Sequence, residues 1–422
     1  MAGGPARDGA ARGDAVGGEA VRDGFDRRGF LKGLSAGAGT WVAAGAGSWV
    51  LRPRWAHAAG PIKVGIATDI TGAIGYAGNS CWQTAQLVAE EINAAGGVAG
   101  RPIQLHLEDT ASNETTAVAN VRRLIQREKV DVVFGGVTSS MRQAIKDPIV
   151  TRGRTLYVYP QLYEGQECTP YLFNTGPTPA QQCDAFIPWL IEQGNKRFCM
   201  PSANYVWPRL LNKYARRVIE SNGGEVVFEE YYPIDQIEYS STVSRIMSER
   251  VDCVFNTVIS PGVGPFFKQL ATAGFLGRGG RLACVYYDEN LLNVNQPEEM
   301  EGLATCLDYF QALDDPFSRG LLAKYNARFP GSRYRFVAGS ACTGMWRGIK
   351  LYEQAVRRTN GDTARDAVAR AYDGAGIPEG PGGGASMVPG KYHCRMNMYI
   401  AEAKAGAYQI RERYEQVDPK EC

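Results

Sequence analysis

The stretch PIQLHLEDTASNETTAVANVRRLIQREKVDVVFGG, residues 102–136, sets two apolar, β-branched runs on either side of an amphipathic segment. The runs at 102–109 and 130–136 predict β-strands, and the 3.6-residue apolar period of 115–128 predicts a helix. Strand, helix and strand in this order predict two parallel strands joined by a covering helix. The alternation continues on both sides, with strands expected at 63–68 and 154–159 and a helix at 81–97.

The second half of the chain repeats this order. KVDVVFGGV at 129–137 resembles RVDCVFNTV at 250–258, which indicates two similar α/β lobes. Strands are expected at 196–201, 251–258 and 281–287, a helix at 209–224, a mostly helical block at 315–373 and strands around 392–402 and 408–414. Two doubly wound lobes enclose a cleft. Because ligands of open parallel sheets bind beyond the carboxyl ends of the strands, the residues just after each strand are the candidate site.

The N-terminal segment has the features of an export signal. Arg27-Arg28-Gly29-Phe30-Leu31-Lys32 is a twin-arginine pattern, an apolar run rich in Gly and Ala follows at 34–51, and the small-residue site Ala56-His57-Ala58 comes next. Residues 1–58 are therefore expected to be a twin-arginine signal peptide, which predicts a periplasmic mature protein. The alternative is an uncleaved anchor, which so much Gly and Ala disfavours.

Charge and histidine content exclude several classes of function. The chain carries 46 Lys and Arg against 44 Asp and Glu, and 38 against 39 without residues 1–58, so no nucleic-acid partner is expected. Only three histidines occur, with no metal-ligand spacing and no Ser/His/Asp set, and no cofactor is expected. The G-x-S-x-G match at 33–37 lies in the export segment. An amide-processing enzyme is kept only as a distant alternative.

All ten cysteines follow residue 58, and an oxidising compartment permits disulfides. Cys199, Cys253 and Cys284 fall in expected strands and fit small core residues. No C-x-x-C occurs and the spacings fix no connectivity. A Cys168–Cys183 pair is the one pairing that we favour.

Five strand ends carry candidate ligand-binding residues. The Gly-rich segment at 69–80 fits no phosphate-binding motif and predicts a tight turn facing the cleft. Hydroxyls at 138–140 suit either N-capping or a ligand oxygen at a helix start. The aromatic clusters at 159–164 and 204–207 fit either a small pocket with apolar walls and a few hydrogen bonds or plain packing. The acidic pair at 288–289 fits either a binding site for a ligand ammonium or an exposed turn. The candidates are Ser139, Ser140, Tyr159, Gln161, Tyr163, Asn204, Tyr205, Trp207, Asp288 and Glu289, and Glu164 follows the same strand end as Tyr163.

These strand ends resemble a known family. INAAGGVAGRPIQLHLEDTASN, VVFGGVTSSMRQA, YPQLYEG, SANYVWPR, VVFEEYYPI and DYFQALDDP are together similar to type I periplasmic binding proteins of the branched-chain amino-acid group, and most similar to urea and short-chain amide receptors. The resemblance covers residues 61–418. It implies a type I periplasmic binding fold with three hinge crossovers near residues 177, 308 and 380. The N-terminal lobe would be 61–177 plus 309–380, and the C-terminal lobe 178–308 plus 381–418.

The resemblance also implies a role for each site residue. Ser139 would hydrogen-bond the amide, Tyr159 and Tyr205 would line the pocket, Trp207 would cover it, and Gln161 matches more loosely. Three positions differ from the pattern of the urea receptors: Val137 replaces an aromatic residue, Gln161 a smaller residue and Asn204 an Asp. The acidic turn at 288–290 is also shorter than the acidic run of that family.

The function expected is a monomeric receptor that delivers urea or a short amide to an ABC permease of the inner membrane. The alternative is an amino-acid receptor, in which Asp288 or Glu289 holds the ammonium and Ser139 with Ser140 holds the carboxylate.

Overall fold

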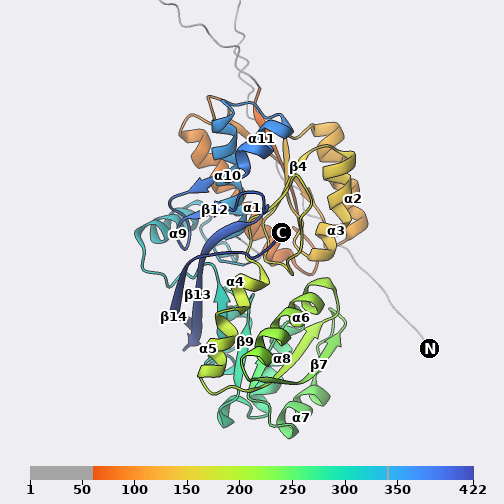
Figure 1. The fold of residues 1–422 in the computed structure, drawn as a ribbon, viewed down its shortest axis with the longest axis vertical. Helices are drawn as coiled ribbons and strands as arrows, with labels where there is room; N and C mark the ends of the chain where they lie inside the picture. Colours follow the sequence, from red (N-terminus) through yellow and green to blue (C-terminus); the bar gives the residue numbers. More distant parts are fainter. Residues whose placement is uncertain (1–59, 340–341) are drawn as a thin grey trace, which may run out of the picture. The chain divides into compact units, whose positions relative to one another are not determined.

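The computed structural model describes residues 60–339 and 342–422 (Figure 1). The predicted twin-arginine signal peptide at 1–58 lies outside these residues. Among the helices described, none is both long enough and apolar enough to cross a membrane.

The first sheet has five strands, all paired in parallel. Its order is 2-1-3-4-5, which is a doubly wound order with its topological switch point between β1 and β3. The helices and π-helical turns that connect its strands are α1 (Gly75–Ala94), α2 (Glu114–Arg123), η1 (Leu124–Glu128), α3 (Ser139–Asp147) and η2 (Pro148–Arg152). The strands are β1 (Ile62–Thr68), β2 (Ile103–Asp109), β3 (Val132–Gly135), β4 (Leu156–Tyr159) and β5 (Leu172–Asn174).

The second sheet repeats this topology and then adds antiparallel strands. Its parallel part runs in the order 7-6-8-9-10, the same pattern as 2-1-3-4-5. Antiparallel β13 then pairs with β10, and β14 and β12 pair with β13. The strands are β6 (Arg197–Ala203), β7 (Glu225–Tyr232), β8 (Cys253–Phe255), β9 (Arg281–Cys284), β10 (Ala304–Leu307), β11 (Gly376–Ile377), β12 (Ala385–Met387), β13 (Cys394–Lys404) and β14 (Ala407–Val417). The predicted α/β fold with two doubly wound lobes is confirmed.

The remaining helices divide between the two sheets. Those around the second sheet are α4 (Pro179–Cys183), α5 (Phe186–Glu192), α6 (Val206–Ser221), α7 (Ser240–Ser248) and α8 (Val263–Thr272), with short 3-10 turns η3 (Leu276–Arg278), η4 (Leu291–Asn293) and η5 (Pro297–Glu299). After β10 the chain returns to the first sheet as α9 (Pro316–Arg328), α10 (Thr343–Arg358) and α11 (Arg365–Tyr372). Ion pairs join α9 to α1, from Lys324 to Glu91 and from Arg328 to Glu90, each at 2.7 Å.

Helix α1 begins at Gly75, earlier than the expected start at 81. Its first turn packs closely on the backbone after β1, where a Cβ on Gly78 would lie 1.9 Å from the carbonyl oxygen of Asp69. The glycine that favoured a long turn in the sequence therefore lies inside a helix, where it lets α1 pack closely on the backbone of Asp69. The turn itself is confined to 69–74. At the start of α3, Thr138 is the N-cap, since its hydroxyl accepts from the Met141 N–H at 3.1 Å.

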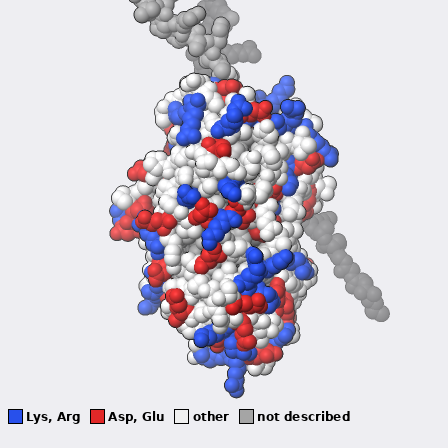
Figure 2. Space-filling view, viewed as in Figure 1, with Lys and Arg blue, Asp and Glu red and all other residues white. Residues whose placement is uncertain are grey.

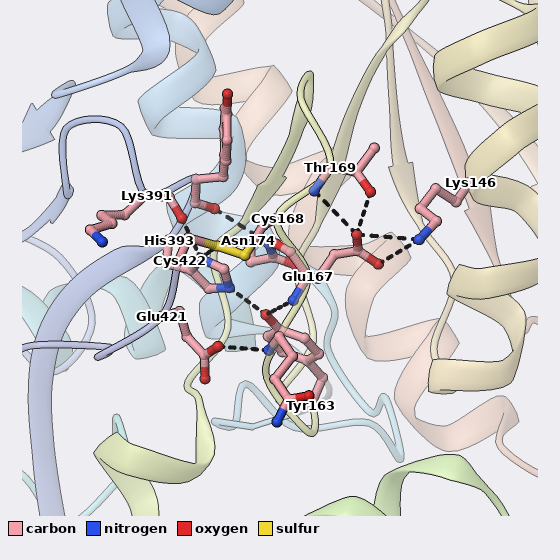
Figure 3. The surroundings of a disulfide bond; sticks show 12 residues. Lys146, Tyr163, Glu167, Cys168, Thr169, Asn174, Lys391, His393, Glu421 and Cys422 are labelled. Carbon is pink, nitrogen blue, oxygen red and sulfur yellow. Dashed lines mark hydrogen bonds and ion pairs between the residues drawn. A yellow bond between two sulfur atoms is a disulfide. The ribbon is translucent and has the colours of Figure 1, made fainter.

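The Cys168–Cys183 pairing is wrong, because Cys168 bonds to Cys422 (Figure 3). The C-terminal tail lies against the loop after β4, where the Glu421 carboxylate accepts from the Gln166 N–H at 2.6 Å. Spacing along the chain could not reveal a partner 254 residues away that only the fold brings close. Free Cys183 is buried, and the strand cysteines 199, 253 and 284 are buried as predicted.

Charges are mixed over the surface. Figure 2 shows Lys and Arg interspersed with Asp and Glu on the face that it presents. This agrees with the near-neutral balance of the sequence after residue 58.

Candidate ligand-binding site

A cavity of about 40 Å³ lies where the two sheets direct their strand ends toward each other. By the space that one water needs, this volume holds roughly three or four water molecules. Every lining residue follows the carboxyl end of β1, β3, β4, β6, β8 or β9, and the first sheet contributes at its switch point. The lining residues are Ile74, Tyr76, Val137, Thr138, Ser139, Leu162, Tyr205, Trp207, Ile259, Ser260 and Tyr286.

One wall of the cavity is the start of α3, where Thr138 and Ser139 contribute hydroxyls. The Ser139 hydroxyl donates to a carboxylate oxygen of Glu164. The other oxygen of Glu164 accepts from Arg142 Nη2 at 2.7 Å, and both side chains of this ion pair are buried. A buried ion pair therefore lies directly behind the polar wall.

The facing wall is aromatic and comes from the second sheet. The Trp207 ring centroid is 6.2 Å from that of Tyr205 and 5.7 Å, edge to face, from that of Tyr286. Trp207 is 3% exposed, and its Nε1 hydrogen has no hydrogen-bond partner among the residues described. A buried indole N–H usually has an acceptor, and this one is left unsatisfied in the structure. The Tyr286 hydroxyl, by contrast, already donates to the carbonyl of Val258.

The structure brings Ser139, Tyr205 and Trp207 together in the cavity wall. Three further candidates, at the end of β4 and on the loop that follows it, are buried behind that wall and do not line it. Tyr159 donates to the carbonyl of Val137 at 2.9 Å, and Gln161 donates to the Cys81 sulfur at 3.5 Å. The Tyr163 hydroxyl pairs with a ring nitrogen of His393 (Figure 3), and burial lowers the pKa of that histidine to about 4. These side chains support the pocket from outside.

Ser140 and Asn204 also lie away from the cavity lining. The Ser140 hydroxyl donates to the Glu114 carboxylate at 2.9 Å, and the Asn204 side-chain oxygen accepts from Arg209 at 2.7 Å. Both residues follow the correct strand ends, but α3 and α6 turn their side chains to other partners. Position after a strand was therefore not sufficient to predict a ligand contact.

Asp288 and Glu289 are buried acids, not lining residues and not an exposed turn. Asp288 accepts from the N–H groups of Asn290 and Leu291 at 2.9 and 3.1 Å, and Glu289 accepts from the Gln311 N–H at 2.7 Å. Burial, with the charge of Glu289 second, raises the pKa of Asp288 to about 8. Burial raises the pKa of Glu289 to about 7. These carboxyls stabilise the loop after β9, so the structure does not place them to hold a ligand ammonium.

Several lining residues had no motif to mark them. Tyr76 lies in the segment for which the sequence predicts a turn, and Leu162, Ile259 and Tyr286 are common core residue types. The internal repeat did contain a signal, because extending the match of 129–137 with 250–258 by two residues aligns Ser139 with Ser260. Both serines line the cavity from equivalent strand ends.

Comparison with known proteins identifies the family. A sequence profile described as periplasmic binding protein matches residues 61–407. An amino acid binding protein of Pseudomonas aeruginosa is 24% identical over 58% of this chain and 67% of its own. The Leu/Ile/Val-binding protein BraC3 of Rhizobium johnstonii is 26% identical over 53% of this chain and 62% of its own. The matches thus span about three fifths to two thirds of these relatives.

Solved structures share the fold along most of the chain. A solute binding protein of an ABC transporter from Rhodopseudomonas palustris, in complex with 3,4-dihydroxybenzoic acid, has a TM-score of 0.77 at 23% identity and covers 85% of this chain and 99% of its own. Leucine binding protein LivK from Thermotoga maritima has a TM-score of 0.72 at 20% identity and covers 84% and 99%.

The matched profile places the chain among the periplasmic binding proteins, which are solute receptors and not enzymes. The chain belongs to the periplasmic binding protein family, and within it to the type I proteins of the branched-chain amino-acid group. The predicted family is confirmed at this level, and the family implies a periplasmic location.

Proposed function

We propose that this protein is the receptor of an ABC importer and binds a small uncharged polar solute, urea or a short-chain amide. The main support for an uncharged ligand is that none of the eleven lining residues found in the described part of the chain is charged. Burying an ion without a counter-charge is costly, and a free amino acid would bring two ions into the cavity. An uncharged solute carries no such cost.

The polar groups of the cavity suit the two sides of an amide. The unpartnered Trp207 N–H can donate to a carbonyl oxygen, and the hydroxyl oxygens of Thr138, Ser139 and Ser260 can accept from amide N–H groups. Val137 stands where urea receptors carry an aromatic residue, which leaves room for a short acyl chain. Acetamide or propionamide is therefore favoured over urea.

Closure of the two lobes would signal to the permease that a solute is bound. A ligand that contacts Ser139 and Trp207 together touches both lobes, so its binding energy favours the closed arrangement. The closed form would then engage the permease as a monomer. The lobe boundaries at 177, 308 and 380 remain part of this proposal, as does export by the twin-arginine route.

A second candidate ligand is an amino or aromatic acid. The cavity lies at the N-terminus of α3, and the positive end of a helix dipole favours a carboxylate oxygen. Relatives are named for leucine, isoleucine and valine, and a structural neighbour holds 3,4-dihydroxybenzoic acid.

Isothermal titration calorimetry separates these ligands. The protein should be unfolded in guanidinium and refolded first, so that solute retained from the cell is removed. Binding of acetamide, propionamide or urea, with none of leucine or 3,4-dihydroxybenzoate, is expected. Binding of either acid alone would overturn the amide proposal.

Replacing Arg27 and Arg28 by Lys should leave the precursor in the cytoplasm, and normal export would refute the predicted route.

A further inference from the structure

The Ser139 hydroxyl hydrogen is already committed. Ser139 is 2% exposed and its hydroxyl lies against a carboxylate oxygen of Glu164, which is 4% exposed. An ionised carboxylate only accepts hydrogen bonds, so the hydrogen between these two oxygens belongs to Ser139. Toward the cavity, Ser139 is left with lone pairs.

The surroundings of Glu164 fix the orientation of its carboxylate. Arg142 Nη2 donates to its second oxygen at 2.7 Å, and the guanidinium lies 5.0 Å and 4.7 Å from the ring centroids of Tyr159 and Tyr163. Arg142 Nε also donates to Glu167 at 3.3 Å. Arg142 and Glu164 thus form a buried ion pair, in which the guanidinium supplies the counter-charge that a buried carboxylate needs. The oxygen that faces Ser139 is consequently fixed as an acceptor.

We propose that Glu164, which does not line the cavity, determines the class of ligand by making Ser139 an acceptor, so that the site selects an N–H donor over a carboxylate. Glu164 is thus a positioning residue that acts through Ser139. This inference rests on the proposed amide function and specifies how an amide is distinguished from the acid of the same size.

The reason lies in the hydrogen-bonding capacity of serine. A hydroxyl has one donor and two acceptor positions, and the donor is used by Glu164. An amide NH2 can donate to the remaining lone pairs. A carboxylate oxygen would instead face those lone pairs, with the negative charge of Glu164 directly behind them. Acetamide and acetate have nearly the same shape, so the ratio of their affinities measures how far the site favours an N–H donor over a carboxylate.

The test is Glu164→Gln, with acetamide and acetate titrated by calorimetry. The glutamine oxygen is expected to stay on Arg142, which only donates, and so its NH2 takes the position facing Ser139. That NH2 donates to the serine oxygen and turns the hydroxyl hydrogen toward the cavity. The preference for acetamide over acetate should fall about tenfold, the effect of about one hydrogen bond gained or lost.

Glu167→Gln is the matched control. It removes one negative charge beside the same Arg142 but does not touch Ser139. Its acetamide preference should equal that of the wild type. If it shifts as much as Glu164→Gln does, local charge and not the serine hydroxyl sets the preference, and the inference is wrong.

Ser139→Ala completes a double-mutant cycle with Glu164→Gln. It also tests the inference by itself if Glu164→Gln does not fold. Alone, it should weaken acetamide binding about tenfold while leaving acetate binding no weaker. In its background, Glu164→Gln should change the preference clearly less than it does in the wild type, because only the contribution that passes through the serine hydroxyl is lost. Equal loss of both ligands on Ser139→Ala overturns the inference, whereas wild-type protein that binds amides keeps the proposed function intact. Wild-type protein that binds neither acetamide nor urea overturns both.

Discussion

Asp288→Asn should make the stability of the protein less dependent on pH. Asp288 is 2% exposed, and its carboxyl oxygen accepts the N–H groups of Asn290 and Leu291, where η4 begins. Burial first, and the charge of Glu289 second, raise its pKa from 3.8 to about 8. Asparagine keeps an oxygen that can accept both N–H groups but does not titrate, so the variant removes the proton-binding group and preserves the cap.

The sign and size follow from linkage between proton binding and folding. The folded state holds the Asp288 proton more tightly than the unfolded state does, so this stabilising contribution is complete below pH about 4 and is lost as the pH rises through about 8. In that window each pH unit costs at most about 1.4 kcal/mol. From pH 5 to pH 7 the wild type should therefore lose up to about 3 kcal/mol through this group, with Glu289 titrating in the same range.

The assay is unfolding in guanidinium chloride at pH 5, 6 and 7, since urea is a candidate ligand. The free energy of unfolding of Asp288→Asn, relative to wild type, should rise by up to about 3 kcal/mol across this range. Asp314→Asn serves as the control, because its side chain is 86% exposed, and its curve should run parallel to that of the wild type. Parallel curves for Asp288→Asn as well would show that this carboxyl is ionised in the folded protein and would refute the reasoning.

Three further substitutions test other parts of the structure. Cys422→Ser opens a loop of 254 residues and should lower the free energy of unfolding by about 2–5 kcal/mol, measured by guanidinium unfolding without reductant; with reductant the variant and wild type should coincide. Trp207→Phe removes the indole donor but keeps an aromatic wall, and calorimetry should show acetamide affinity reduced by about 0.5–1.5 kcal/mol; unchanged affinity would mean that the donor does not reach the ligand. Gly78→Ala should lower the melting temperature markedly, because its Cβ would lie 1.9 Å from the Asp69 oxygen, whereas Gly277→Ala has nothing within 4 Å and should melt like wild type.

Much of the fold could be predicted because each strand and helix carries its own periodicity. The strands at 102–109 and 130–136 and the helix between them are read from neighbouring residues alone, and the structure has them as β2, β3 and α2. The start of α1 could not be predicted in this way. Gly75 and Gly78 favour a turn by local preference, and only the tertiary structure shows the backbone of Ile70 packed against Gly75 and that of Asp69 against Gly78.

The candidate site divides in the same manner. Ser139, Tyr205 and Trp207 were predicted because parallel strands must end at one edge of a sheet, and residues after those ends converge. Tyr159, Gln161 and Asp288 follow strand ends too, yet their side chains turn inward to buried partners. Side-chain direction depends on packing from distant segments, and strand position does not specify it.

The sequence by itself determined two α/β lobes and the strand ends that meet between them, because hydrophobic periodicity and parallel-sheet topology are local and directional properties. Only the tertiary structure decided the Cys168–Cys422 bond, the burial of Asp288 and Glu289, and the contact of Glu164 with Ser139. Each of these joins groups whose protonation, pairing or orientation depends on what surrounds them in space, and residues far apart in the chain supply those surroundings.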